Sequence, residues 1–290
     1  MSNKSNLAKA IDNNCHDDGI TETSISGLKL YRSEICINRR PVVYHPAICL
    51  VAQGQKKMHY GDVTCSYDSD NYLINSLTIP VEAEVLDASD DAPYLGLSLQ
   101  IDSYLIGQLL IDMDQAFAVN DANNEVAVST KVTDHLNDCL IRLLDCLENE
   151  MDRKVLAPSL KREIFYEVLK GPNGDILRNC VANHAGSNKI APVIQFIEEN
   201  FHTPLDVETI AKFAGMSPST LHDRFKQITS MSPMQFVKSL RLHKAHSLLL
   251  SGNPASEASY QVGYNSPSQF SREFKRFFGD SPRDVQSSAR

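Results

Sequence analysis

The chain has 290 residues, 42% of them hydrophobic and 22% charged, which fits two globular domains and excludes collagen-like, mucin-like and low-complexity chains. No apolar run approaches the roughly 20 residues that span a bilayer, and the first residues lack the apolar core of a signal peptide, so we expect a cytoplasmic protein without a membrane segment. The net charge of −8 is unevenly divided: residues 189–290 carry 12 Lys/Arg and 9 Asp/Glu, whereas the preceding 188 residues carry a net −11.

The first hundred residues predict a β-rich domain. Residues 1–24 are polar and lack periodicity, which predicts a flexible arm or, alternatively, a short capping helix. From Leu28 to Ile101, short apolar runs such as Ala47–Val51 alternate with turn signals such as Gly61-Asp62. Many short strands with closely spaced turns are typical of an antiparallel barrel or jelly roll, and barrels of that size often hold one small ligand.

Helices are predicted after the strands. Asp102 can cap a helix over residues 103–110, and Lys131–Asn149 carries apolar residues at helical spacing. This apolar stripe suits two partners, either the barrel of the same chain or the same helix of a second subunit. Another helix is predicted over Ser159–Leu169, and residues 171–189 have the composition of an interdomain linker.

The seven cysteines do not predict a metal site, because no CxxC or Cys/His spacing suggests zinc. We expect free thiols, several of them buried, with redox sensing as the alternative. Cys139 and Cys146 are two turns apart on one helix face, so they cannot form a disulfide with each other within an intact helix, although they could do so across a dimer interface.

The C-terminal third contains an internal repeat. A shift of 49 residues places Ser217-Pro218-Ser219 on Ser266-Pro267-Ser268 and Phe225-Lys226 on Phe274-Lys275, with Asn265 as one extra turn residue in the second copy. Each copy predicts a helix, a Gly-containing turn and a second helix, and a long helix over residues 234–251 joins them. This is the helix-turn-helix pattern, in which the second helix enters the major groove of DNA.

The polar faces of the two second helices supply the candidate DNA-binding residues. A polar face with Arg and Lys on a single helix is usually only solvated, but two such helices in repeated units favour DNA binding. Arg272 and Gln269 are the candidates for base reading, because Arg pairs with guanine and Gln with adenine. Lys226, Arg241, Lys275 and Arg276 suit phosphates. The remaining candidates on the two faces are Ser219, Thr220, His222, Asp223 and Ser268.

These motifs resemble the DNA-binding domain of the AraC/XylS family of transcription regulators. The resemblance is carried by Gly215-Met216-Ser217, Arg224-Phe225-Lys226, Val262-Gly263-Tyr264 and the run from Ser266 to Gly279. Ala52-Gln53-Gly54-Gln55-Lys56 and the strand pattern resemble the cupin-type sensor domain of one subgroup. The family pattern implies that Asp223 occupies a position where a basic residue often contacts bases, so the second unit is expected to carry more of the sequence reading.

The resemblance implies an α+β protein with four segments: an arm (1–24), a cupin-like sensing and dimerisation domain (25–170), a linker (171–189) and a DNA-binding domain (190–290). Its expected partners are promoter DNA, a small-molecule effector, RNA polymerase and a second copy of the chain. The alternative is a DNA-binding regulator controlled by a protein partner or by cysteine oxidation. We expect no enzyme, metal or cofactor, because His45 and His59 are isolated and no HxH pair, Walker loop or GxGxxG motif occurs.

Overall fold

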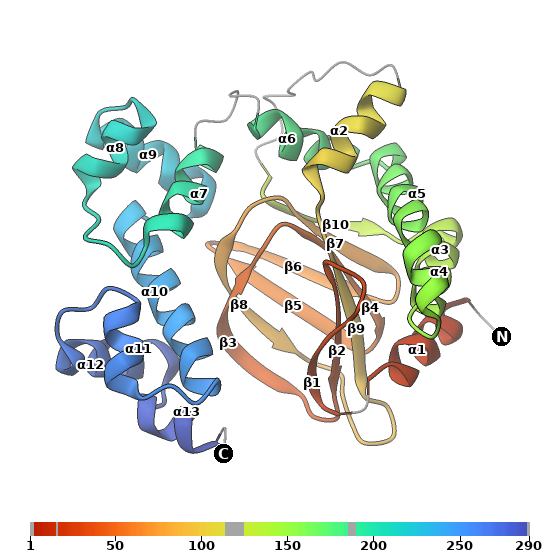
Figure 1. Cartoon of the computed structure of the whole chain (residues 1–290), viewed down its shortest axis with the longest axis horizontal. Helices are drawn as coiled ribbons and strands as arrows, with labels where there is room; N and C mark the ends of the chain where they lie inside the picture. Colours follow the sequence, from red (N-terminus) through yellow and green to blue (C-terminus); the bar gives the residue numbers. More distant parts are fainter. Residues whose placement is uncertain (1–2, 16, 114–124, 185–189, 289–290) are drawn as a thin grey trace. The chain divides into compact units, whose positions relative to one another are not determined.

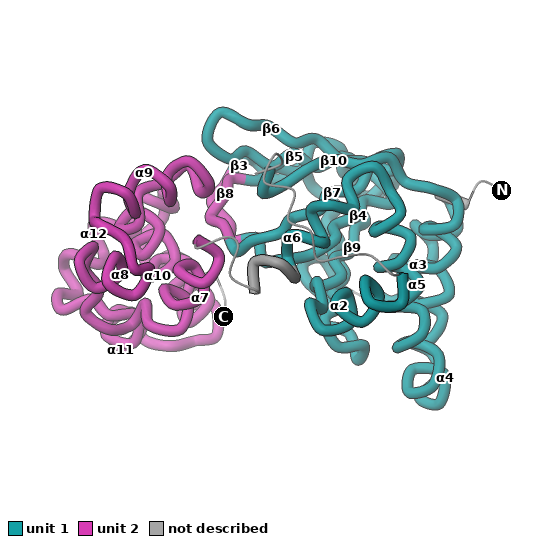
Figure 2. Tube along the Cα trace, turned by 90° about the horizontal axis from the view of Figure 1, so that it is seen from above, with its two compact units in different colours: residues 1–39, 44–78, 83–187 teal, residues 40–43, 79–82, 188–290 magenta. Residues whose placement is uncertain are grey.

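The computed structural model describes residues 3–15, 17–113, 125–184 and 190–288. The chain folds into two compact units (Figure 2). The first comprises residues 1–39, 44–78 and 83–187, and the second comprises residues 40–43, 79–82 and 188–290. Within the described ranges, no helix is long and apolar enough to cross a membrane.

The first unit contains most of a curved antiparallel sheet that forms a half-barrel (Figure 1). The strand order is β1-β2-β9-β4-β7-β6-β5-β8-β3, with β10 paired to β7. This architecture confirms the predicted antiparallel barrel. The strands are β1 (Gly19–Glu22), β2 (Leu28–Ser33), β3 (Ile37–Tyr44), β4 (Ala47–Gln53), β5 (Gln55–Tyr60), β6 (Val63–Asp68), β7 (Asn71–Asn75), β8 (Ile79–Val85), β9 (Tyr94–Gln100) and β10 (Ala127–Lys131).

The central strands β4 and β9 have two chemically different faces, because successive side chains of a strand point to opposite sides. Ile48, Leu50, Leu97 and Leu99 are at most 2% exposed and belong to the core that the sheet shares with the helices. The alternate positions, Cys49 and Val51 on β4 with Gly96 and Ser98 on β9, therefore face the concave side of the sheet.

The helices of the first unit cover the convex side of the sheet, with α1, α3, α4 and α5 grouped together (Figure 1). Asp102 caps α2 as predicted, because its carboxylate accepts the Leu105 N–H at 3.0 Å. The helices are α1 (Asn3–Asn13), α2 (Ser103–Asp112), α3 (Asp134–Asp145), α4 (Glu150–Val155), α5 (Ala157–Lys170) and α6 (Gly174–His184).

Three segments differ from the sequence-based expectations. Residues 3–13 form a helix with Leu7 and Ile11 in the core, so this segment is a capping helix and not a flexible arm. The helix expected over Lys131–Asn149 begins only at Asp134, because β10 pairs with β7 through Lys131 and Thr133 then caps α3. The expected linker contains α6, whose Ile176 and Leu177 are buried in the core of the first unit.

The apolar stripe of α3 is used inside the first unit. Leu136, Cys139, Leu140, Leu143 and Leu144 are each at most 2% exposed and pack in one core with α1 and α5. Of the two partners that the sequence allowed, the described structure shows the one within the same chain. The outward face of α3 is polar.

The second unit contains the predicted repeat. Helices α8 and α9 form one helix-turn-helix, α11 and α12 form the other, and α10 joins them. Asp206, Ser217 and Ser266 accept N–H groups of the first turns of α8, α9 and α12, so a side chain caps each of these helices. The bounds are α7 (Ile190–Asn200), α8 (Val207–Ala214), α9 (Pro218–Thr229), α10 (Pro233–Leu250), α11 (Ala255–Gln261), α12 (Pro267–Phe278) and α13 (Pro282–Ser288).

Gly54 forms the corner between β4 and β5. Its φ of +84° lies in the region that favours glycine, and a Cβ at this position would overlap the backbone carbonyl of Asp87. Gln53 supports the same corner, because its Nε2 donates to the Pro93 carbonyl at 2.8 Å. The Gln-Gly pair of the sequence motif therefore fixes the direction in which β5 leaves the corner.

We predict that Gly54→Ala destabilises the first unit by about 2–4 kcal/mol, because it adds a steric overlap with backbone to the cost of positive φ. Urea denaturation followed by circular dichroism measures the loss. Gly19→Ala is the matched control, since Gly19 also has positive φ but open space around its Cβ position, and it should cost less. Equal losses for the two variants would contradict the steric role of Gly54.

Candidate nucleic-acid interface

Buried aromatic side chains fix the orientation of the two second helices. Phe225 of α9 is fully buried and packs edge-to-face on Phe236 of α10, with ring centroids 5.3 Å apart. In α12, Phe270 and Phe274 are fully buried, and Tyr264 packs on Phe270 at 5.4 Å. Because these residues anchor one face of each helix, the opposite face is held toward solvent.

The exposed face of α9 brings together the predicted residues of the first unit. Ser219, Thr220, His222, Asp223 and Lys226 are all exposed. The Oγ atom of Ser217 contacts both hydroxyls of the first turn, at 3.1 Å from Ser219 and 2.8 Å from Thr220. His222 Nδ1 lies 3.5 Å from the Asp223 carboxylate, whose side chain is 84% exposed. An acidic group therefore stands in the middle of this face.

The exposed face of α12 is more basic. It displays Arg272, Lys275 and Arg276 together with the predicted Ser268 and Gln269. The amide Nε2 of Gln269 donates to Glu273 at 3.3 Å, which leaves the amide oxygen and the second N–H for another partner. The amide is thus oriented before any ligand arrives.

Glu273, which the sequence analysis did not select, connects α12 to the rest of the unit. Its carboxylate accepts the Tyr264 hydroxyl at 3.0 Å and pairs with Lys238 of α10 at 2.9 Å. Partial burial raises the pKa of Glu273, but hydrogen bonds from Lys238, Gln269 and Tyr264 outweigh it and lower the pKa overall. A carboxylate four residues after Gln269, on the same helix face, was the only signal in the sequence.

Arg241 is placed differently from the other predicted residues. Its guanidinium donates to the carbonyl of Phe201 at 2.7 Å and to that of Thr203 at 2.8 Å, so it ties α10 to the loop between α7 and α8. Gly263 in the turn of the second repeat meets the same loop, because a Cβ there would lie 2.7 Å from the His202 carbonyl. Two of the Arg241 donors are therefore engaged inside the domain.

Residues 24–176, more than half of the chain, match the model of the AraC-type transcriptional regulator N-terminus. The chain belongs to the AraC-type transcriptional regulators. Residues 210–288 of this AraC-type regulator match a helix-turn-helix domain, in agreement with the repeat. Both halves of the resemblance seen in the sequence are thereby confirmed.

Curated relatives of this AraC-type regulator include the transcriptional activators RhaS of Salmonella schwarzengrund and Salmonella newport. Each is 30% identical over 151 residues, which are 51% of this chain and 52% of the relative, so the chain spans about half the length of the curated relatives it matches.

Solved structures of ToxT from Vibrio cholerae share the fold of the regulator. An apo ToxT variant has a TM-score of 0.66 at 11% identity, covering 93% of this chain and all of the other. ToxT bound to an unsaturated fatty acid has a TM-score of 0.64 at 14% identity, covering 89% of this chain and 94% of the other. At these identities the likeness concerns the fold.

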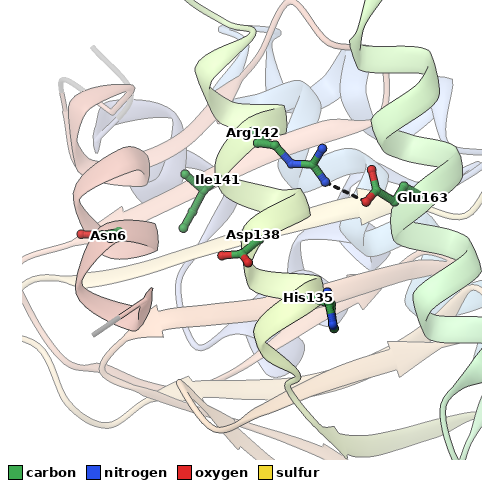
Figure 3. Close-up of a pocket in the computed structure, with 6 residues that line it drawn as sticks. All are labelled: Asn6, His135, Asp138, Ile141, Arg142 and Glu163. Carbon is green, nitrogen blue, oxygen red and sulfur yellow. Dashed lines mark hydrogen bonds and ion pairs between the residues drawn. The ribbon is translucent and has the colours of Figure 1, made fainter. Parts of the chain in front are cut away.

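The first unit of the regulator has a shallow cleft on its helical layer, of about 430 Å³ (Figure 3). Asn6 of α1, Glu163 of α5 and four residues of α3 line it, and Arg142 donates to Glu163 at 2.7 Å across its edge. Its lining combines one basic side chain, Arg142, with two acidic ones, Asp138 and Glu163, so the cleft does not present a field of one sign to an ion. No group of three or more potential metal ligands occurs among the described residues.

A histidine pair lies in the aromatic core of the second unit. The His243 ring packs edge-on against Phe277 and Phe278, each at 5.3 Å, and its Nε2 is buried without a hydrogen-bond partner. Burial, with a smaller contribution from His246, lowers the pKa of His243 to about 3. His243 is therefore neutral in the folded domain at physiological pH.

We predict that His243 makes the second unit less stable in mild acid. Above pH 6.5 the ring is neutral in both states, whereas below it only the unfolded chain binds the proton, so stability falls as pH decreases toward 3. Between pH 7 and pH 5 the loss is about 2 kcal/mol, set by the 1.5 pH units below the unfolded pKa.

His243→Phe should remove this part of the pH dependence, which urea denaturation at pH 7 and pH 5 measures. Replacing His222, which is exposed in the same unit, controls for the loss of a histidine as such. An equally steep fall in stability in His243→Phe would mean that other groups cause it.

Proposed function

We propose that α9 and α12 enter successive major-groove segments of promoter DNA and that α12 carries most of the base reading. The observation that carries the proposal is the unequal charge of two equivalent, firmly anchored faces. The α12 face has Arg272, Lys275 and Arg276 beside the oriented amide of Gln269, whereas Asp223 stands on the α9 face. In this assignment Arg272 and Gln269 contact bases.

The remaining predicted residues receive supporting roles in this proposal. Lys226, Lys275 and Arg276 contact phosphates and set the register of the domain on the duplex. Ser219, Thr220, His222 and Ser268 line the groove-facing surfaces. Arg241 contributes by holding the loop between α7 and α8, and any phosphate contact it makes uses the donors that Phe201 and Thr203 leave unused.

We further propose that the regulator acts in the cytoplasm as a homodimer that activates transcription through RNA polymerase. The curated relatives it matches are named activators, which supports this direction of regulation. The dimer contact is proposed on the polar outward face of α3, because the apolar stripe of that helix is already buried. Two linked copies would place their α9 and α12 helices on two half-sites. No enzymatic activity is proposed.

The first unit is proposed to bind a small molecule on the concave side of its sheet and to transmit the occupancy to DNA binding. A protein with the same fold, ToxT, has been solved with an unsaturated fatty acid bound, which supports a sensing role. Control by cysteine oxidation is less favoured, because burial raises the pKa of Cys49 and Cys139 to about 11 and that of Cys180 to about 12. Of the cysteines, all of which lie in the described part of the chain, Cys36 is the one whose side chain is exposed.

We predict different outcomes for two basic residues of α12. Arg272→Ala should weaken binding to the selected site by about 1–3 kcal/mol and relax the preference at one base pair. Lys275→Ala should weaken binding to all sequences alike. It should also make the slope of log K against log salt concentration less steep by about one, because one phosphate contact is lost. Selection of bound sites from random DNA, followed by titrations at several salt concentrations, measures both effects.

Lys244→Ala is the matched control for the loss of one exposed positive charge, because Lys244 belongs to α10 and to neither α9 nor α12. It should leave the selected sequence unchanged. The assignment of α12 as the main reading helix fails if Arg272→Ala selects the same sequence as the unmodified chain with the same stringency.

A further inference from the structure

Lys56, the last residue of the Ala-Gln-Gly-Gln-Lys motif, lies on the concave side of the half-barrel. It is directly opposite Tyr67 of β6 in the strand register and shares its side of β5 with Met58, which is fully buried. Its Nζ lies 5.3 Å from the centroid of the Tyr31 ring, 5.4 Å from that of Tyr44 and 6.0 Å from that of Tyr94. These rings come from β2, β3 and β9, so the curvature of the sheet brings them around one ammonium group.

The groups around Lys56 are polar but uncharged. The Tyr44 and Tyr67 hydroxyls are 2.8 Å apart, and the Tyr31 hydroxyl is 3.0 Å from Ser98 Oγ. Burial raises the pKa of the Tyr31, Tyr67 and Tyr94 hydroxyls, so they remain protonated. Ring faces attract the ammonium by cation–π interaction, but they do not neutralise it.

No carboxylate of the described chain lies within ion-pair distance of Lys56, although other lysines of the protein, such as Lys29, Lys170 and Lys238, have one. A charge taken partly out of water is costly unless it is paired. An isolated ammonium inside an aromatic enclosure therefore attracts an anion from solution. The ring faces at the same time offer an apolar surface to whatever carries that anion.

We propose that Lys56, with Tyr31, Tyr44 and Tyr94, binds the carboxylate of a small effector that has an apolar or aromatic body. One ammonium with neutral hydroxyl neighbours matches the single charge of a carboxylate, whereas a doubly charged phosphate would stay half neutralised. The carboxylate would accept a hydrogen bond from Lys56 Nζ, and the body would lie along the tyrosine rings. This proposal rests on the sensing role proposed above and names the chemical class of the effector.

Gly96 of β9 leaves the space that the tyrosine rings around Lys56 occupy. It faces Tyr31 in the register of β2 with β9, and a Cβ at Gly96 would lie 2.7 Å from the Tyr94 hydroxyl. The absence of a side chain at position 96 therefore lets the Tyr94 ring lie over the strand toward Lys56. Gly54 contributes through the corner that directs β5, and with it Lys56, to the concave side.

The test uses the full-length protein and three probe acids, octanoate, cinnamate and palmitoleate, each compared with its uncharged primary amide. Calorimetric titration measures affinity, and tyrosine fluorescence reports on the enclosure, since the chain has no tryptophan. We expect at least one acid to bind saturably and at least tenfold more tightly than its amide. The proposal is overturned if no acid binds at 1 mM, or if acid and amide bind equally well.

Variants then locate the site. Lys56→Met should weaken binding of the acid tenfold or more and leave the amide unaffected, while Lys56→Arg should retain part of the difference. Lys57→Met is the matched control, because Lys57 is the next residue of β5 and lies on the opposite side of the strand. Equal affinity of the acid for Lys56→Met and the unmodified chain would overturn the proposal. The comparison of acid with amide on the unmodified chain does not depend on how the variants fold.

Failure of this proposal is distinguishable from failure of the proposed function. Selection of DNA sites without added probe tests the reading helices alone, and Lys56→Met should select the same sequence as the unmodified chain. Acid binding that depends on Lys56 but does not change the affinity for DNA supports the site and refutes the sensing role. DNA selection that succeeds while no acid binds overturns the site and leaves the reading helices in place.

Discussion

The first unit depends on the two-residue period of its central strands β4 and β9. One set of alternate side chains, represented by Leu50 and Leu97, is apolar and holds α1, α3 and α5 against the sheet. The other set, Cys49, Val51, Gly96 and Ser98, consists of small side chains and leaves room on the concave side for rings from neighbouring strands. A shift of one residue in this register would exchange the two sets, so the helical layer and the tyrosine enclosure exist only together.

The second unit shows how a duplicated motif can keep its scaffold while its exposed faces differ. Both copies keep the same serine cap, proline and buried aromatic residue, which are the parts that place a helix. They differ where placement does not constrain them, on the exposed faces. In the second copy the helix before the turn, α11, is short and begins without a side-chain cap, and the Glu273 contacts to Lys238 and Tyr264 give α12 an additional attachment.

The features that the sequence predicts well are those whose cause is local. Asp206, Ser217 and Ser266 cap helices through neighbours three residues away, and the repeat defines the helix-turn-helix units without reference to the rest of the chain. Arg241 could not be placed, because its acceptors are backbone carbonyls 38 and 40 residues earlier. The start of α3 was missed because β10 takes up Lys131 through pairing with a distant strand, which overrides the helical periodicity. The tyrosines around Lys56 are brought together only by the curvature of the sheet.

Helix α10 limits which changes of sequence the second unit can accept. Its 18 residues form an unbroken rod of about 27 Å between the two helix-turn-helix units. Inserting or deleting one residue within the rod would turn one unit about 100° relative to the other around its axis, and in the proposed binding mode α9 and α12 could then no longer follow the same groove. Exposed side chains on α12 can change freely without this effect. In the proposed binding mode, the distance and angle between α9 and α12 therefore tolerate insertions far less than the exposed positions of α12 tolerate substitutions.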